Sequence, residues 1–109
     1  MKRYIIFLLL IFSTSAFAAN TLPLPGQSLA NEKLQSDTLM TSYAAAGTKV
    51  SNCNNYSVIN TKVLRQPANG SWKEEWVINA CGKNVFVPIT FILNSTGATY
   101  AISAREIHF

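Results

Sequence analysis

The sequence predicts an α+β fold, in which one N-terminal helix packs on a four-stranded antiparallel meander and one disulfide ties the loop before the sheet to it. Three observations predict this fold. Residues 29–46 contain no proline or glycine, and four segments rich in β-branched and aromatic residues follow them. Loops of about four residues join these segments, which suits hairpins and not parallel crossovers. The two cysteines, Cys53 and Cys81, bracket the first expected hairpin.

The first residues have the pattern of an export signal. Lys2 and Arg3 precede an uninterrupted apolar run over residues 5–12, and residues 16–18 read Ala-Phe-Ala, a cleavage motif. The run is too short for a membrane span, which needs about 20 residues. We therefore expect a signal peptide over residues 1–18, a mature protein in the periplasm or outside the cell, and no membrane association after cleavage.

The mature chain would have 109 − 18 = 91 residues, which is enough for a single domain over residues 28–109. Its charge is 7 basic minus 5 acidic residues, or +2, and like charges do not cluster. A nucleic-acid partner requires a basic patch, so we expect no nucleic acid.

Residues 19–27 carry two prolines and one glycine and are expected to form a flexible leader. Ser28 as N-cap and Gly47 as C′ residue then predict a helix over residues 28–46. Two adjoining stripes at helical spacing would face the sheet. They comprise Leu34, Thr38, Thr41 and Ala45, and Met40, Tyr43, Ala44 and Gly47.

Four strands are expected after the helix, and turn-forming residues separate them. The strands cover residues 56–66, 71–80, 85–93 and 98–103, the last with a continuation toward His108 as an alternative. The turns read Pro-Ala-Asn-Gly, Cys-Gly-Lys-Asn and Asn-Ser-Thr-Gly. Such turns favour hairpins, and the strands therefore form a meander.

Export would place Cys53 and Cys81 in an oxidising compartment, where they have one intramolecular pairing. In one register of the first hairpin, Cys81 falls opposite Tyr56, within reach of Cys53. Closing a loop of about 29 residues would stabilise the fold by about 3.5 kcal/mol. Two thiols and His108 are too few for a metal site. We therefore expect a structural disulfide, with no metal and no cofactor.

Trp72, Glu74 and Trp76 alternate along the second strand and therefore share one face. Two interpretations are open. In the first, the face is core and Glu74 is paired, with Arg65 of the neighbouring strand beside it or stacked on an indole. In the second, the face is an open aromatic platform with one carboxylate, suited to a sugar ring or a peptide.

Pro88 lies in what the meander makes an inner strand, where its missing N–H would interrupt the ladder. Either the strand is bulged there or it is an edge. The second face of this strand is unusually apolar, with Phe86, Pro88, Thr90 and Ile92. The leader or the C-terminal tail would cover this face, or it would meet a partner or form a homodimer.

Catalytic patterns are weak in this sequence. Glu74 and Glu75 are adjacent in a strand and point to opposite faces, which rules out a carboxylate pair, and His108 lies near the C-terminus. We expect a non-enzymatic binding, inhibitor or accessory module with a protein or glycan partner. The expected binding residues are Trp72, Glu74, Trp76, Phe86 and Ile92. The alternatives are a small cell-wall or glycan-acting enzyme that uses Glu74, and a structural homo-oligomer.

Overall fold

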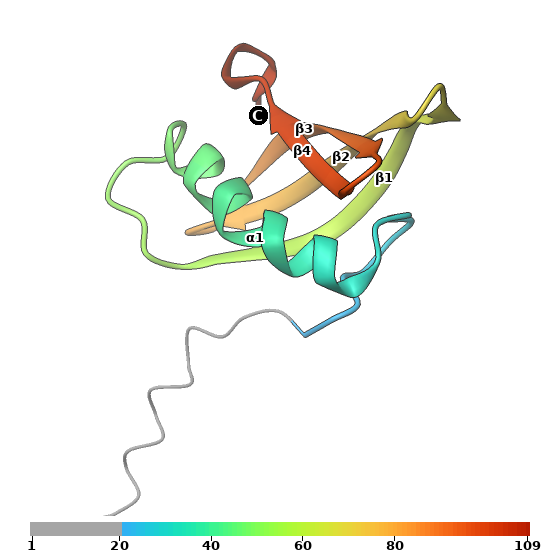
Figure 1. Ribbon diagram of the computed structural model, residues 1–109. Coiled ribbons are helices and arrows are strands. Elements are labelled where there is room, and N and C mark those ends of the chain that lie inside the picture. The colour runs from blue at the N-terminus through green and yellow to red at the C-terminus, as the bar shows by residue number, and fades with distance from the viewer. Residues whose placement is uncertain (1–20) are drawn as a thin grey trace, which may run out of the picture.

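The computed structural model describes residues 21–109, so the expected signal peptide over residues 1–18 lies outside the described residues. One helix packs on one face of a four-stranded antiparallel sheet with the strand order β1-β2-β3-β4 (Figure 1). The predicted α+β fold is confirmed. The elements are α1 (Glu32–Gly47), β1 (Tyr56–Ala68), β2 (Ser71–Ala80), β3 (Lys83–Asn94), β4 (Gly97–Ile102) and the short 3-10 helix η2 (Ala104–Glu106).

Helix α1 begins four residues later than the sequence predicts, because Asn31 and not Ser28 is its N-cap. The Asn31 side chain accepts the N–H of Leu34 at 2.9 Å. The Ser28 hydroxyl instead accepts the N–H of Ala30 at 3.2 Å, which stabilises a turn just before the helix. Gly47 is the last helical residue and Thr48 is the C-cap, so the helix extends one residue beyond its predicted end at residue 46.

The face that α1 turns to the sheet is more polar than the predicted stripes. Its buried residues follow a four-residue spacing and include two hydroxyl side chains: Leu34, Gln35, Thr38, Ser42 and Ala46. Thr38 and Ser42 donate their hydroxyls to carbonyls of the same helix, at 2.7 and 2.6 Å. These side chains are therefore satisfied when buried, and their small size lets the helix approach a sheet with bulky aromatic residues. Of the predicted stripes, Thr41, Met40 and Ala44 are exposed.

Strands β2 and β3 form the regular centre of the sheet, with continuous pairing from Ser71↔Ile92 to Ala80↔Lys83. The outer strand β1 is irregular, because its pairing with β2 shifts register at three places. Ile59 and Leu64 are the extra residues at the first two shifts, and they are 45% and 44% exposed. Bulges of this kind bend an edge strand and make it a poor template for another strand.

The segment predicted as a flexible leader is anchored in its described part, residues 21–27. Gln27 donates its backbone N–H to the Thr61 carbonyl at 2.8 Å, and the Thr61 hydroxyl donates to the Pro25 carbonyl at 2.8 Å. Leu24 is only 5% exposed. Gly26 has a φ of +105°, and a Cβ at this position would overlap the backbone of Thr61. A glycine is therefore required where the leader crosses β1.

Pro88 is neither at a bulge of β3 nor at an edge of the sheet. Phe86 donates its N–H to His108 on the β4 side, and backbone groups alternate in direction along a strand, so the Pro88 nitrogen also faces that side. On this side, β3 pairs with the end of β4 at Ile89↔Ile102, and with the C-terminal segment at Phe86↔His108. Between these pairs the chain leaves the sheet through η2. Pro88 thus lacks its N–H where no ladder partner is present.

Candidate functional site

Glu74 is completely buried, and its carboxylate receives three N–H donors. Trp72 donates its indole N–H to Oε2 at 2.8 Å, and Trp76 donates to Oε1 at 2.9 Å. Leu29, just before α1, donates its backbone N–H to Oε2 at 2.8 Å. The two tryptophans are 5% and 0% exposed, and both rings lie against Phe91 of β3. The carboxylate therefore joins the backbone just before α1 to strand β2.

This arrangement favours the first interpretation of the Trp72–Glu74–Trp76 face, with a correction to the expected partner. The face is core, so these residues form no open platform and offer Glu74 to no substrate in this conformation. The expected partner Arg65 lies elsewhere: it pairs with Lys73, and its guanidinium contacts the carbonyl and the hydroxyl of Ser71. Glu74 is instead paired with three neutral N–H groups, the indoles of Trp72 and Trp76 on its own strand and the backbone of Leu29.

The second face of β3 is partly covered by the C-terminal segment. The imidazole of His108 stacks on Phe86 with 5.3 Å between ring centroids, and Glu106 forms an ion pair with Lys73 of β2 at 2.9 Å. Pro88 is buried, whereas Ile92 is 37% exposed. Phe86 and Ile92 therefore do not form one continuous exposed surface, and the tail accounts for the apolar character around Phe86.

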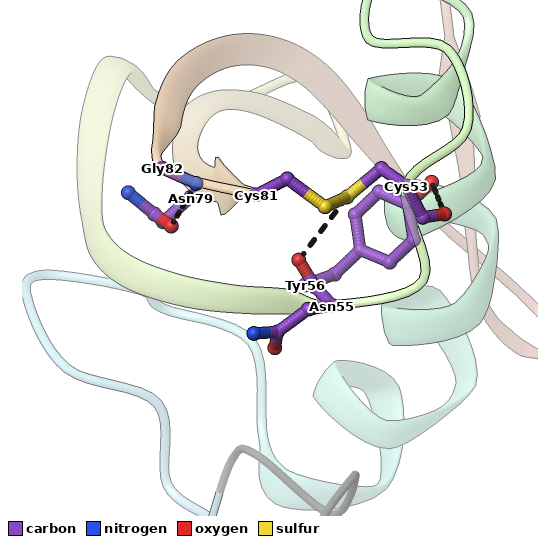
Figure 2. Close-up of a disulfide and its surroundings, with 6 residues drawn as sticks. All are labelled: Cys53, Asn55, Tyr56, Asn79, Cys81 and Gly82. Atoms are coloured by element: carbon purple, nitrogen blue, oxygen red, sulfur yellow. Dashed lines mark hydrogen bonds between the residues drawn. A yellow bond between two sulfur atoms is a disulfide. The ribbon is translucent and has the colours of Figure 1, made fainter.

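The predicted disulfide between Cys53 and Cys81 is present, with 5.8 Å between the Cα atoms (Figure 2). It links the loop after α1 to the turn between β2 and β3. Cys81 donates its backbone N–H to the Asn55 carbonyl at 3.1 Å, and Tyr56 donates its hydroxyl to the Cys53 carbonyl at 2.9 Å. Tyr56 pairs with Ala80, one residue away from the register in which it faced Cys81. The loop is thus fixed at the first residue of β1.

A groove lies next to this fixed loop, between the second half of α1 and the start of β1. We call it the tyrosine groove; its volume is about 540 Å³ and its lining is Met40, Tyr43, Ala44, Asn54 and Tyr56. The rings of Tyr43 and Tyr56 are stacked, with 5.5 Å between centroids and 19° between planes. Met40 is 71% exposed, the largest exposure among the large apolar side chains of residues 21–109.

Burial raises the pKa of the Tyr43 phenol above its ordinary value. Tyr43 is therefore protonated at neutral pH and acts in the groove as an aromatic surface with a hydroxyl. The other polar groups of the lining residues are the Asn54 amide and the Tyr56 hydroxyl, which donates to the Cys53 carbonyl. A groove of this composition can hold an apolar side chain or ring, but it has no carboxylate, imidazole or amine to transfer a proton near neutral pH.

The tyrosine groove cannot be recognised from the sequence patterns. Helical spacing predicts that Met40 and Tyr43 face the sheet, and Tyr56 at the start of a strand carries no signal of its own. The available signal was the combination of an adjacent disulfide loop and a Met–x–x–Tyr–Ala stretch on a helix. This combination indicates a groove only if the rotation of α1 is known. The buried face of α1 is polar, so hydropathy does not reveal that rotation.

Comparisons with protein-family models, with curated proteins and with solved structures find no match for this chain. Within residues 21–109, no group of three histidine, cysteine, aspartate or glutamate side chains is arranged to hold a metal ion. The helices in this same range are too short or too polar to span a membrane.

Proposed function

We propose that the protein is a small non-enzymatic binding module that acts in the periplasm or outside the cell, and that its tyrosine groove holds an apolar side chain of a partner protein. The carrying observation is the exposed Met40 beside the stacked Tyr43 and Tyr56 rings. Methionine and tyrosine are enriched where proteins meet, and rigid aromatic side chains lose little entropy on binding.

The groove is also rigid, which lowers the cost of binding. The Tyr56 hydroxyl donates to Cys53, and the disulfide holds Cys53 to the turn after β2. Gly47 leaves room for the Tyr56 hydroxyl, because a Cβ at this position would lie 2.8 Å from its oxygen and would shift the ring. One wall of the groove is therefore set by contacts that do not depend on a partner.

Binding is favoured over catalysis by the placement of the titratable groups. The candidate carboxylate of an enzyme, Glu74, is completely buried and bonded to three N–H groups. Glu75 and Glu106 lie beside His108 and Lys73 respectively, on the opposite side of the sheet. None of them lines the tyrosine groove.

A disulfide in a domain of this size is compatible with an oxidising compartment outside the cytoplasm. The export pattern of residues 1–18 supports the same location, through cleavage after Ala18. The proposed binding would then take place where the disulfide, and with it the rigid side of the groove, is maintained.

The test is site-specific photo-crosslinking in the cells that produce the protein. A photoreactive phenylalanine analogue at Met40 should give a defined protein adduct, which mass spectrometry identifies, and the same analogue at Ser36, exposed one turn earlier on α1, should not. Asn54→Arg should remove the adduct by filling the groove, whereas the neighbouring Asn55→Arg should keep it. Identical products at positions 40 and 36, or an adduct insensitive to Asn54→Arg, would rule out the groove as the binding site.

A further inference from the structure

The outer edge of β4 (Gly97–Ile102) carries backbone groups that no described residue satisfies. Hydrogen-bonding groups alternate in direction along a strand. Phe86 exchanges backbone hydrogen bonds with His108, so Thr90 and Ile92, two and three alternations further along β3 on the same side, also face β4. Their partners in the register are Ala101 and Thr99, which therefore bond to β3. Ala98, Tyr100 and Ile102 therefore direct their N–H and C=O groups away from the sheet.

The two edges of the sheet differ in how they are protected. The β1 edge has three register shifts and a proline, Pro67. The leader also occupies it, because Gln27 bonds to the Thr61 carbonyl and its side chain accepts the N–H of Val63 at 3.1 Å. The β4 edge has no charge, no proline and no register shift over residues 97–102. Edge strands without such devices are open to pairing with another strand.

Two hollows lie between α1 and β4, one on each side of Tyr100. The Tyr100 hydroxyl separates them, because it reaches α1 at Thr41 Oγ1 (2.7 Å) and at the Asp37 carbonyl (3.2 Å). The polar hollow, about 340 Å³, is lined by Asn31, Lys33, Leu34, Asp37, Thr96, Gly97 and Ala98. The apolar hollow, about 270 Å³, is lined by Thr41, Ala44, Ala45, Thr48, Ile102, Ala104 and Ile107.

We propose that an extended segment of a partner protein adds to this sheet as a fifth strand, antiparallel to β4. Such a strand would exchange backbone hydrogen bonds with Ala98, Tyr100 and Ile102. Every second side chain of the segment would point to the α1 side, at intervals of about 6.8 Å. The side chains opposite Ile102 and Ala98 would enter the apolar and the polar hollow, and the one between them would lie over Tyr100.

The two hollows specify the chemistry of the segment. Read from its N-terminus, it would present an aliphatic residue to the apolar hollow, a small residue beside Tyr100 and a polar residue to the hollow with Lys33 and Asp37. The recognised pattern is therefore aliphatic–x–small–x–polar. Backbone pairing supplies affinity and the two hollows supply selectivity, as in other sites of strand addition.

The same asymmetry disfavours a second copy of this chain as the occupant. In a two-fold antiparallel pairing centred on Tyr100, the copy would place its own isoleucine at the polar hollow. It would place its alanine at the apolar hollow and its tyrosine against Tyr100. The isoleucine would be mismatched at the polar hollow and the alanine would leave the apolar hollow unfilled, so a partner with a different sequence fits better than a homodimer.

The probe is a nonapeptide, acetyl-Lys-Thr-Val-Thr-Ala-Thr-Gln-Thr-Lys-amide, added at a concentration on the order of 1 mM to the oxidised mature protein. Amide hydrogen exchange measured by NMR should slow about tenfold at Ala98, Tyr100 and Ile102, with little change at Thr99 and Ala101, which already bond to β3. A control peptide with Val and Gln exchanged keeps the composition, presents the polar side chain to the apolar hollow, and cannot regain the recognised order by sliding along β4. It should protect the same amides at least about threefold less.

Ala98→Pro removes one outward N–H at an edge position where proline is tolerated, and should abolish the protection, whereas Ala98→Val should keep it. If Ala98→Pro does not fold, Ala104→Arg fills the apolar hollow without changing the β4 backbone, and should weaken peptide binding at least about tenfold. Unchanged exchange with the peptide, equal protection by both peptides, or a stable dimer without peptide would overturn the proposal. Asn54→Arg should leave this protection unchanged, which separates failure here from failure at the tyrosine groove.

Discussion

Replacing Glu74 by glutamine tests whether the buried carboxylate holds the core together. A carboxylate has two oxygens that only accept hydrogen bonds, and here both are used, by Trp76 at Oε1 and by Trp72 and Leu29 at Oε2. The side-chain amide introduced by Glu74→Gln has one oxygen and one NH₂ group. In its best orientation the oxygen keeps the two donors at the Oε2 position, and the NH₂ group faces the indole N–H of Trp76.

The expected loss follows from these contacts. An unsatisfied buried N–H costs about 1–3 kcal/mol, and the two remaining bonds weaken because the acceptor is no longer charged. The lower cost of burying a neutral amide offsets part of this loss. We expect Glu74→Gln to lower the free energy of unfolding by about 2–3 kcal/mol, which corresponds to a fall in Tm of roughly 10–20 °C for a domain of this size.

Urea unfolding monitored by tryptophan fluorescence measures this change directly, because both indoles lie at the site. Glu75→Gln is the matched control: it makes the same substitution one residue away, on the opposite face, where the carboxylate lies 3.9 Å from His108 Nε2. It should change the free energy of unfolding by less than about 0.5 kcal/mol. Equal effects of the two substitutions would refute the structural role assigned to Glu74.

Three further predictions concern the leader, the disulfide and the groove. Gly26→Ala should lower the unfolding free energy by more than about 2 kcal/mol, because the added Cβ overlaps the β1 backbone. Gly82→Ala is the control: Gly82 also has a positive φ, but open space surrounds it, so the substitution should cost about 1–2 kcal/mol. Equal losses in thermal unfolding would contradict the overlap. Joint replacement of Cys53 and Cys81 by serine should cost about 3.5 kcal/mol in urea unfolding, and a loss below about 1 kcal/mol would count against the disulfide as a stabilising link. The raised pKa of Tyr43 means that the folded state holds this proton more tightly, so its contribution to stability is present below the ordinary pKa of tyrosine and is lost as pH rises through the folded pKa. Ultraviolet titration should therefore show one late-ionising phenol that Tyr43→Phe removes, and its persistence in that variant would assign it elsewhere.

The parts of the fold that depend on local chemistry could be predicted from the sequence. The strands follow from β-branched residues, and the turns follow from residues that tolerate positive φ: Asn69 and Gly70 have φ of 54° and 80° in the first hairpin. The disulfide follows from two cysteines and from the export that the pattern of residues 1–18 leads us to expect. These features depend on short segments, so their signal is present in the chain itself.

The parts of the fold that depend on distant contacts differ from the sequence-based predictions. Leu34 and Thr38 are buried as the first stripe predicts, but Ser42, which belongs to neither stripe, is also buried with its hydroxyl bonded to its own helix. Hydropathy does not detect such a residue, so the rotation of α1 that would bury Met40 and Ala44 is wrong. Two of the partners of Glu74 were already visible in the pattern Trp–x–Glu–x–Trp. The third, Leu29, lies 45 residues away and could not be inferred from strand periodicity.

The anchoring of the N-terminal segment, residues 24–29, couples its docking to the hairpin of β1 and β2. One of its hydrogen bonds goes to Gln35 of α1, but its other distant partners are residues 61, 63 and 74, so most of these bonds require β1 and β2 to be in place. The last step would then close the N-terminal segment over Glu74 and complete the set of donors around its carboxylate. A fusion placed directly before this segment would therefore interfere with the end of folding, although it is attached to the beginning of the chain.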